Sequence, residues 1–411
     1  MNNPFTSELF VTIWSKHFNN AKKALNFDFI HHVSFYKIKL LPLYVNIGKN
    51  LTKGIYYSLN YEAKDFKKKV FLIYDVPQFF GLDPFEEKRS TLRCDEIFQY
   101  QGFLLNFTEF PTAQDYVNSR VSSKNRRGLR SRQERLEHCF DINYRFYTDD
   151  ITKDEFDVVF HQFHELLSDR FSGKKVNYHH LRPDKWAFHS EFSYAMMKEN
   201  KASLFVIYNG SMPIAVTLNI HSEEIVFVAI TVFDPDFYKF NIGKTTIVKI
   251  IEWCYEHNFK IADFSKGEFD FKYEWCNVVY DFNYHLLYDS KSLRARFVAW
   301  MVKSFLETKR YLREKNVNVL YRKFLYKIKK KEDDHAVEKF KIEDLDGFDS
   351  DSTYEIIDLQ NQTYNHLKVF VYSFLFLNSE PLKNVVIYKK RNSDKEFIIK
   401  GKVKSQRVTF N

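Results

Sequence analysis

The stretch IADFSKGEFDFKYEWCN, residues 261–277, joins a short apolar strand to a dense group of polar and aromatic side chains. The strand ends near Asp263, and Glu268, Lys272 and Tyr273 follow within ten residues. Carboxylates accept protons, phenols donate them and ammonium groups bind anions, so these side chains suit general acid–base chemistry. Packing alone does not require this mixture, and α/β folds place ligand sites where strands end in polar loops. The stretch is therefore the first candidate for an active site.

A second candidate is YKFNIGKTT, residues 238–246, which leads into a predicted helix. A helix N-terminus offers unpaired N–H groups and the positive end of the helix dipole, and both attract phosphate. Asn241 can form the turn, because asparagine tolerates positive φ better than other residues with a side chain. An ordinary capped helix is the alternative, because one glycine before a helix is weak support for an anion site. The donors would come from Gly243, Lys244, Thr245 and Thr246.

The elements that would position these candidates follow a regular order between residues 141 and 290. Hydrophobic periodicity predicts strand, helix, helix, three strands, helix, strand, a short helix and a last strand. The turn Asn209-Gly210-Ser211-Met212 indicates a hairpin between the first two of the three consecutive strands. The corresponding segments are INYRFYT, TKDEFDVVFHQFHELLSDRF, HSEFSYAMMKEN, SLFVIYN, PIAVTLNIH, EIVFVAITVF, TTIVKIIEWCYEHN, KIADF and VVYDFNYHLLY.

The flanking segments are less regular. A helix is predicted over residues 6–26, then strand-like pieces, then a basic helix that Thr112 can cap. Residues 291–331 are predicted as a long basic helix or helix pair, followed by a charged linker and a strand-rich tail. Within that tail VFVYSFLFL, residues 369–377, is predicted as a buried strand.

Composition limits the class of protein. At 411 residues, 45% of them hydrophobic, the chain can form two or three domains with substantial cores. The four cysteines lack metal-ligand or disulfide-framework spacing, so no metal site is expected. The N-terminus lacks the pattern of a signal peptide, and no apolar run reaches the length of a membrane span. A cytoplasmic protein is therefore expected, with attachment to the inner face of the membrane as an addition.

Two basic stretches, residues 120–135 and 308–331, account for much of the net charge of +9. A solvated helix face is the simplest interpretation of each. Contact with an anionic membrane surface or an acyl carrier protein comes next, and nucleic acid is the least favoured partner.

The order of elements in residues 141–290 resembles that of the GNAT acyltransferase superfamily, and three sequence segments resemble its CelD-like acetyltransferase family. These segments are NPFTSELFVTIWSKHF, DYVNSRVSSKNRRGLRSRQERLE and NIGKTTIVKIIEWCYEHNFKIADFSKGEFDFKYEW. The family's strand–loop motif matches Asp263, Phe264, Gly267, Phe271, Lys272 and Trp275. Members resemble the Fem-type aminoacyltransferases in having two GNAT-like halves. The resemblance covers about residues 5–325.

The resemblance implies an α/β (α+β) fold with two GNAT-like domains in tandem and a small β-rich extension. The expected boundaries are 1–140 for a degenerate N-terminal domain, 141–330 for the acyl-CoA-binding catalytic domain and 331–411 for the linker and tail. The implied activity is direct transfer of an acyl group from acetyl-CoA or another acyl-CoA to an amine. The acceptor would be an amino sugar of a glycan, an amino lipid or a small amine.

The resemblance also implies roles for the candidate residues. Asp263 and Glu268 would serve as base, Tyr273 as acid, and Lys272 would hold a phosphate or an acidic acceptor. A backbone N–H between Ile230 and Val232 would polarise the thioester carbonyl. The donor site would comprise Val232, Asn241, Ile242, Gly243, Lys244, Thr245, Thr246 and Gly267. The acceptor side would include Arg170, Tyr178, His179 and His180, whereas Trp275 is expected in the core.

Two alternatives stay open. A Fem-type enzyme would keep the fold and take its acyl group from aminoacyl-tRNA, which the basic stretches would bind. The second alternative is a catalytically inactive GNAT-like binding protein, because Tyr238, Asn241 and Phe271 depart from the sequence pattern of the superfamily.

Overall fold

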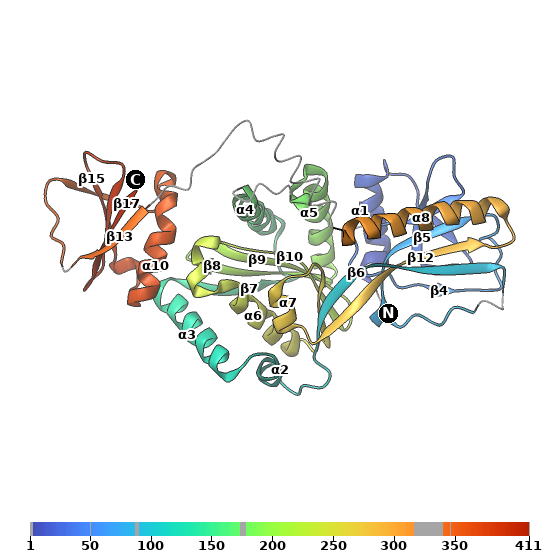
Figure 1. Ribbon diagram of the computed structural model, residues 1–411, viewed down its shortest axis with the longest axis horizontal. Helices are drawn as coiled ribbons and strands as arrows, with labels where there is room; N and C mark the ends of the chain where they lie inside the picture. Colours follow the sequence, from blue (N-terminus) through green and yellow to red (C-terminus); the bar gives the residue numbers. More distant parts are fainter. Residues whose placement is uncertain are drawn as a thin grey trace.

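The computed structural model describes residues 3–49, 51–86, 90–172, 178–315, 340–345 and 347–410. It contains one large sheet with helices on its faces and a second, smaller sheet at the C-terminal end (Figure 1). The order of elements that was predicted for residues 141–290 is confirmed throughout.

The N-terminal part of the chain forms a short 3-10 helix and an α-helix, which are followed by strands. Thr112 caps α2 as predicted, because its side chain accepts a hydrogen bond from the N–H of Asp115. The predicted basic helix is two helices, because the chain is extended at Val121 and Ser122 starts a new helix as its N-cap. The elements are η1 (Pro4–Thr6), α1 (Glu8–Phe18), β1 (Leu25–Phe27), β2 (Ile30–Lys37), β3 (Leu43–Asn46), β4 (Ser58–Leu59), β5 (Val70–Pro77), η2 (Gln78–Phe80), β6 (Leu92–Asn106), α2 (Ala113–Arg120) and α3 (Ser123–Cys139).

The following part alternates strands and helices. Its elements are β7 (Ile142–Tyr147), α4 (Lys153–Ser172), η3 (His179–Leu181), α5 (Pro183–Lys198), β8 (Ala202–Asn209), β9 (Met212–His221), β10 (Ile225–Phe233), η4 (Pro235–Phe240), α6 (Ile242–Glu256), β11 (Ile261–Lys266), α7 (Asp270–Trp275), β12 (Val278–Asp289) and α8 (Leu293–Glu314). The remainder of the predicted basic helix, beyond residue 315, lies outside the described residues.

The large sheet has the strand order β1-β2-β3-β5-β12-β6-β11-β10-β9-β8-β7, and β4 pairs with β2. Its two parallel pairs are β3–β5 and β10–β11. The pair β3–β5 is flanked by the antiparallel strands β2 and β1 on its outer side and by β12 on its inner side. The pair β10–β11 is flanked by the antiparallel strands β9 and β8 on its outer side and by β6 on its inner side. The neighbours therefore repeat outward from the central β6–β12 pair, which confirms the expected tandem arrangement of two GNAT-like halves.

The two halves exchange strands at the centre of the sheet. The long strand β6 comes from the N-terminal half, yet it pairs with β11 as well as with β12. In turn β12 follows β11 in the chain and pairs with β5 of the N-terminal half. The domain boundaries near residues 140 and 330 stay a prediction, because this shared sheet crosses the first of them.

Helices cover both faces of the C-terminal half of the sheet, with α4 and α5 on one side and α6 and α7 on the other (Figure 1). One core cluster joins α1, α4 and α5 to β8, β9 and β10. Another lies on the opposite face and joins α2, α3 and α6 to the same strands. In the N-terminal half α8 packs against β3, β5 and β12 through Ala295, Val298, Ala299 and Leu306.

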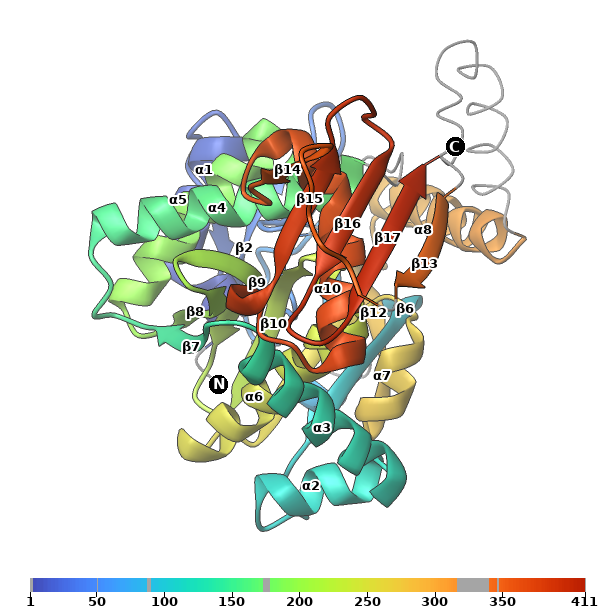
Figure 2. The same ribbon diagram turned by 90° about the vertical axis from the view of Figure 1, so that its left-hand side faces the viewer.

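The C-terminal extension is a five-stranded antiparallel sheet with one helix behind it (Figure 2). Its elements are β13 (Phe340–Leu345), β14 (Tyr354–Ile357), η5 (Gln362–Leu367), α10 (Lys368–Asn378), η6 (Leu382–Asn384), β15 (Val386–Lys390), β16 (Glu396–Lys400) and β17 (Ser405–Phe410). The predicted strand at 369–377 is wrong, because VFVYSFLFL forms α10. A short apolar run does not distinguish a strand from a buried helix, and here Val371, Phe374 and Leu375 share one buried face.

Candidate active site

Strands β10 and β11 run side by side for only three residue pairs and then separate. The pairs are Ile225 with Ile261, Val226 with Ala262 and Phe227 with Asp263. Immediately afterwards the register of β10 on β9 shifts around Ala229, and that of β11 on β6 shifts around Phe264. A bulge bends the strand that carries it, so two bulges at the same level direct the strands apart. Among the described residues, no strand pairs with β10 beyond Phe227 on the side that faces β11.

A small pocket of about 30 Å³ lies where the strands separate. Its wall includes the bulged Ala229 and the next residue, Ile230. The lining combines apolar side chains with two lysines and three histidines, and the described lining contains no carboxylate. The lining residues are Phe5, Leu51, Thr52, Lys53, His179, His180, Phe188, His189, Phe192, Leu218, Ile220, Ala229, Ile230 and Lys266.

Asp263 is fully buried beside this pocket. It pairs with Phe227, whose ring contacts the ring of the pocket residue Phe5 at a centroid distance of 5.1 Å. Its Oδ1 accepts hydrogen bonds from the N–H of Ser265 (2.8 Å) and the hydroxyl of Tyr280 (2.7 Å). Its Oδ2 has no hydrogen-bond partner among the residues that the structure describes. The side chain is therefore held in place through one oxygen, and the other oxygen can take up a proton.

Burial raises the pKa of Asp263 above its usual value, and this effect exceeds the opposing effects of the hydrogen bonds from Tyr280 and Ser265 and of the charges of Lys53 and Lys272. A carboxylate with a raised pKa is a stronger base than a solvated one. Asp263 thus has the environment that a general base requires.

The N-terminal half contributes Lys53 to the same place. Its ammonium interacts electrostatically with Asp263 and Lys266. Burial and the charge of Lys266 lower the pKa of Lys53 to about 8, and the two nearby aspartates oppose this change. In the described part of the chain, the Lys53 ammonium donates no hydrogen bond. Its position leaves it available for an anion in the pocket.

Asp75, the second aspartate near Lys53, is bound differently. Its Oδ1 accepts hydrogen bonds from Gln99 Nε2 (2.8 Å) and the Tyr100 hydroxyl (2.6 Å), and its Oδ2 accepts one from Thr52 Oγ1 (2.8 Å). Both oxygens are thus occupied by protein groups. The backbone of Asp75 has a φ of +61°, a strained conformation that this network holds in place.

Lys272 is buried, and its ammonium donates to three backbone carbonyls, those of Phe264 (2.7 Å), Ser265 (3.0 Å) and Lys266 (2.7 Å). The side chain therefore fixes the bulged end of β11. Gly267 follows with a φ of +103°, which glycine adopts readily.

The remaining candidates in this stretch lie on the surface or in the core. Glu268 and Tyr273 are exposed, and neither lines the pocket. The Tyr273 ring contacts Phe103, which belongs to the core on the face opposite the pocket. Trp275 is buried in that core, as predicted.

The predicted phosphate loop has the expected backbone. Asn241 adopts a left-handed conformation (φ 59°, ψ 38°) as the N-cap of α6, and its side chain makes no capping hydrogen bond. The N–H groups of Lys244 and Thr245 both donate to the carbonyl of Asn241, whereas those of Ile242 and Gly243 have no backbone partner among the described residues. A Cβ at Gly243 would lie 3.0 Å from the Phe233 ring, so glycine permits close packing against the end of β10.

The side chains of this loop are mostly committed elsewhere. Lys244 pairs with Glu274 at 2.7 Å, and Thr246 Oγ1 donates to the carbonyl of Ile242 at 3.0 Å. Thr245 is buried, and its Oγ1 lacks a partner in the described structure. Val232 is buried in the core on the pocket side of the sheet. Any anion site at this loop would therefore depend on its backbone.

The residues expected on the acceptor side divide into two groups. His179 and His180 line the pocket, and His180 Nδ1 lies 2.9 Å from Nε2 of His189. Burial lowers the pKa of all three histidines, so they are neutral at pH 7. Arg170 instead donates to the carbonyl of Phe233 at 2.9 Å, and the Tyr178 ring stacks on Phe171.

Sequence reasoning missed Lys53, Lys266, His189 and Asp75. The one available signal was an isolated aspartate within each of two apolar strands, VFLIYDV and KIADF. No group of three or more His, Cys, Asp or Glu side chains in the described ranges is arranged to hold a metal ion.

Comparison with known families places the acetyltransferase domain within this structure. Residues 123–273, from α3 to α7, match the family model described as "Acetyltransferase (GNAT) domain". The chain therefore contains a GNAT acetyltransferase domain, which indicates an acyltransferase. The more specific resemblance to the CelD-like family stays a prediction. No curated protein sequence matches the chain.

Several solved structures are similar in fold. A conserved protein of unknown function from Bacteroides thetaiotaomicron VPI-5482 is similar over 69% of this chain and 91% of its own, with 10% identity and a TM-score of 0.45. FemX is similar over 61% of this chain and 83% of its own, with 11% identity and a TM-score of 0.41. A tandem GNAT protein from the clavulanic acid biosynthesis pathway is similar over 63% of this chain and 78% of its own, with 10% identity and a TM-score of 0.31.

Proposed function

We propose that the chain is an acyl-CoA-dependent N-acyltransferase that moves an acyl group directly from a thioester to an amine. The observation that supports this most strongly is the separation of β10 from β11 beside a pocket, with a buried carboxylate at the last residue pair. A parted strand pair offers unpaired backbone N–H groups, and these stabilise the oxyanion of acyl transfer.

The donor would lie along β10, with its reactive end near Ala229 and Ile230. The N–H groups of Ile242 and Gly243, at the start of α6, suit a phosphate of the coenzyme. Coenzyme A supplies an activated thioester, and the residues around it orient that group. No cysteine is needed as a nucleophile, and burial raises the pKa of Cys276, the cysteine nearest this site in the sequence, to about 12.

Asp263 is the proposed general base. The amine nitrogen attacks the thioester carbon, the new C–N bond forms and the C–S bond breaks. Asp263 Oδ2 accepts the proton that the amine loses, and the protonated Asp263 returns one proton to the departing thiolate. The step therefore balances without a further reactant. Asp263 suits this role better than Glu268, which is exposed.

The acceptor is proposed to carry an anionic group besides its amine. Lys53 and Lys266 both line the pocket, and the described lining offers them no carboxylate. The positive charges of Lys53 and Lys266 repel each other, so an anion between them would be favoured. A carboxylate or a phosphate ester on the acceptor would satisfy this requirement. Phosphoethanolamine and ethanolamine form a suitable pair of probes, and acetyl transfer to the former should have the higher kcat/KM.

Calorimetric titration with acetyl-CoA tests the donor. The wild-type chain should bind acetyl-CoA, and Gly243→Glu should abolish binding because it places a carboxylate at the proposed phosphate site. Val403→Glu introduces the same side chain at an exposed position of the C-terminal extension and should leave binding unchanged.

The same titration separates the alternatives. Binding of tRNA without binding of acetyl-CoA would support the Fem-type alternative. Binding of neither ligand would favour an inactive binding protein. Acetyl-CoA binding that is equal in wild-type and Gly243→Glu protein would contradict the proposed donor site.

A further inference from the structure

Helix α8 presents apolar side chains on two opposite faces. Its inner face packs on the N-terminal half of the sheet through Ala295, Val298, Ala299 and Leu306. On its outer face Leu293 is 79% exposed, Phe297 58%, Trp300 62% and Tyr311 58%. These positions recur at the spacing that aligns side chains along one side of a helix. An apolar stripe of this kind on a surface helix indicates an interaction site.

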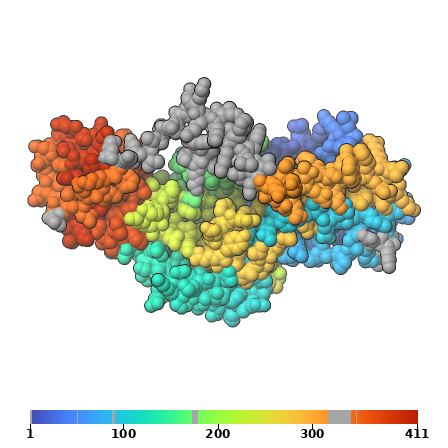
Figure 3. Space-filling view, in the orientation of Figure 1, coloured from blue at the N-terminus to red at the C-terminus, as the bar shows by residue number. Residues whose placement is uncertain are grey.

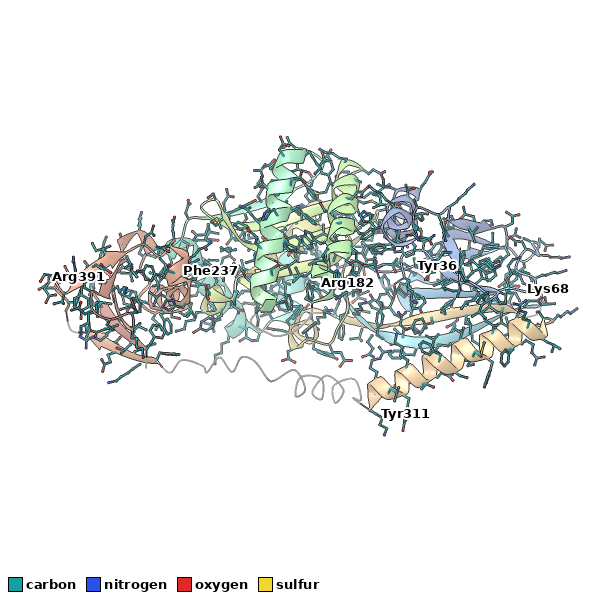
Figure 4. The ribbon with its side chains drawn as sticks, turned by 90° about the horizontal axis from the view of Figure 1, so that it is seen from above. Tyr36, Lys68, Arg182, Phe237, Tyr311 and Arg391 are labelled. Carbon is teal, nitrogen blue, oxygen red and sulfur yellow. The ribbon has the colours of Figure 1, made fainter. Side chains whose placement is uncertain are left out.

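The figures show how open this helix is. In Figure 3 α8, in orange, runs across the surface of the N-terminal half. Seen from above in Figure 4, it forms the edge of the molecule, and the labelled Tyr311 points away from the body of the protein, whereas Phe237 lies at the contact with the C-terminal extension.

A second apolar group lies next to the beginning of α8. Leu40, in the turn between β2 and β3, is 94% exposed. Its backbone has a φ of +67°, a conformation that is unfavourable for leucine, and its carbonyl accepts a hydrogen bond from Arg294 (3.4 Å). The turn thus holds a leucine outward within reach of the Arg294 side chain at the beginning of α8. Strained backbone that exposes an apolar side chain is more readily explained by contact with a partner than by stability.

Basic residues surround these apolar groups. Helix α8 contains six Lys or Arg residues and two Glu residues. Lys37 and Lys39 in and beside the turn are exposed, as are Arg294 and Arg296 at the start of the helix. A second copy of this chain would bring like charges together if it used the same surface. Charge complementarity therefore favours an anionic partner.

We propose that the outer face of α8 and the β2–β3 turn dock onto an anionic lipid bilayer. Aromatic and leucine side chains that enter the interface, with Lys and Arg beside anionic headgroups, are the features of peripheral membrane attachment. No helix in the described part of the chain is long and apolar enough to cross a membrane. In this arrangement α8 lies parallel to the bilayer surface. The inference does not depend on the proposed acyltransferase activity.

Sedimentation of the full chain with vesicles tests this inference. Vesicles of phosphatidylcholine with phosphatidylglycerol should retain at least about tenfold more protein than phosphatidylcholine alone. High salt should reduce the retained fraction, because it screens the headgroup charge. The double variant Leu293→Ser with Phe297→Ser should lose this binding, whereas Ile356→Ser, which changes an exposed residue of the C-terminal extension, should keep it.

Tryptophan fluorescence gives an independent readout. The chain has five tryptophans, and Trp300 alone is exposed. Its emission should shift to shorter wavelength when vesicles with phosphatidylglycerol are added to wild-type protein, and the shift should be absent in the double variant, which retains Trp300. Circular dichroism confirms that the double variant is folded.

Three outcomes would overturn the inference. These are the absence of binding to anionic vesicles, equal binding by wild-type protein and the folded double variant, and a concentration-dependent dimer that the double variant abolishes. The last result would assign the surface to a second copy of the chain.

Discussion

The two halves of the molecule contain the same strand arrangement but use it differently. In the N-terminal half β3 and β5 are parallel for three residue pairs, as are β10 and β11 in the C-terminal half. Between β10 and β11 the chain forms α6, whose N-terminus adjoins the end of β10. Between β3 and β5 the described residues form only the short strand β4.

This difference indicates a division of labour. The described residues of the N-terminal connection form no helix whose N-terminus could bind a phosphate, and the connection sends Thr52 and Lys53 to the pocket of the other half. Each half also contains an aspartate that is completely buried, Asp75 or Asp263. Asp75 has both oxygens occupied, whereas Asp263 keeps one oxygen without a described partner. The C-terminal half would thus perform the transfer, and the N-terminal half would complete its pocket.

The largest effect on catalysis is expected at Asp263 and should distinguish it from Asp75. Asp263→Asn removes the proposed base, so kcat for acetyl transfer should fall about a hundredfold to ten-thousandfold. Acetyl-CoA affinity should stay the same, because Asp263 lies on the proton path and does not hold the coenzyme. Steady-state kinetics and calorimetry measure the two quantities.

Asp75→Asn is the matched variant in the other half. Asparagine keeps one oxygen for Gln99 and Tyr100 but replaces the oxygen that accepts from Thr52 by an NH2 group, so the variant should lower the free energy of unfolding by about 1–3 kcal/mol. Denaturant titration measures this loss. If Asp75→Asn instead reduced kcat as severely as Asp263→Asn while the fold stayed stable, the division of labour would be wrong.

The contribution of Lys53 tests whether the N-terminal half completes the pocket. Lys53→Met should lower kcat/KM for phosphoethanolamine about 10- to 100-fold, because a charge-assisted hydrogen bond is lost, and should affect ethanolamine far less. Lys49→Met, on the same connection but outside the pocket lining, is the control. Equal losses for both acceptors would argue against an anion at Lys53.

The pH dependence sharpens the assignment of the base. Since burial raises the pKa of Asp263, activity should rise with pH through that pKa, whereas the contribution of Asp263 to stability should fall. That contribution is fully present below the usual pKa of aspartate and is lost as pH rises through the raised one. Removing the positive charge in Lys53→Met should move the acidic limb of the kcat/KM profile upward by about one pH unit. An unmoved limb would exclude Asp263 as the titrating group.

The smallest effect is expected at Glu268. Because this side chain is exposed and outside the pocket lining, Glu268→Gln should change kcat/KM by less than about twofold. A loss comparable to that of Asp263→Asn would return the role of base to Glu268.

Much of the fold could be predicted from local sequence patterns. The order of strands and helices in residues 141–290 follows from hydrophobic periodicity, and the Thr112 cap and the Asn241 turn follow from side-chain and backbone preferences. The prediction of a strand for VFVYSFLFL was wrong, because a short apolar run has no periodicity that distinguishes a helix from a strand.

The site depended on contacts between distant segments. Lys53 enters the pocket from a connection in the other half, and nothing in LTKGIYY marks it as functional. The bulges at Ala229 and Phe264 arise from pairing with β9 and β6, which single-strand patterns do not contain. Lys272 has the residue type of an anion ligand, but its ammonium binds three carbonyls of its own chain segment.

A structure of the protein with acetyl-CoA bound would locate the donor site. We expect density for the coenzyme between β10 and β11, beyond Phe227 and Asp263, with a phosphate at the N–H groups of Ile242 and Gly243. Density between β3 and β5, or at a site away from both strand pairs, would contradict the proposed donor site.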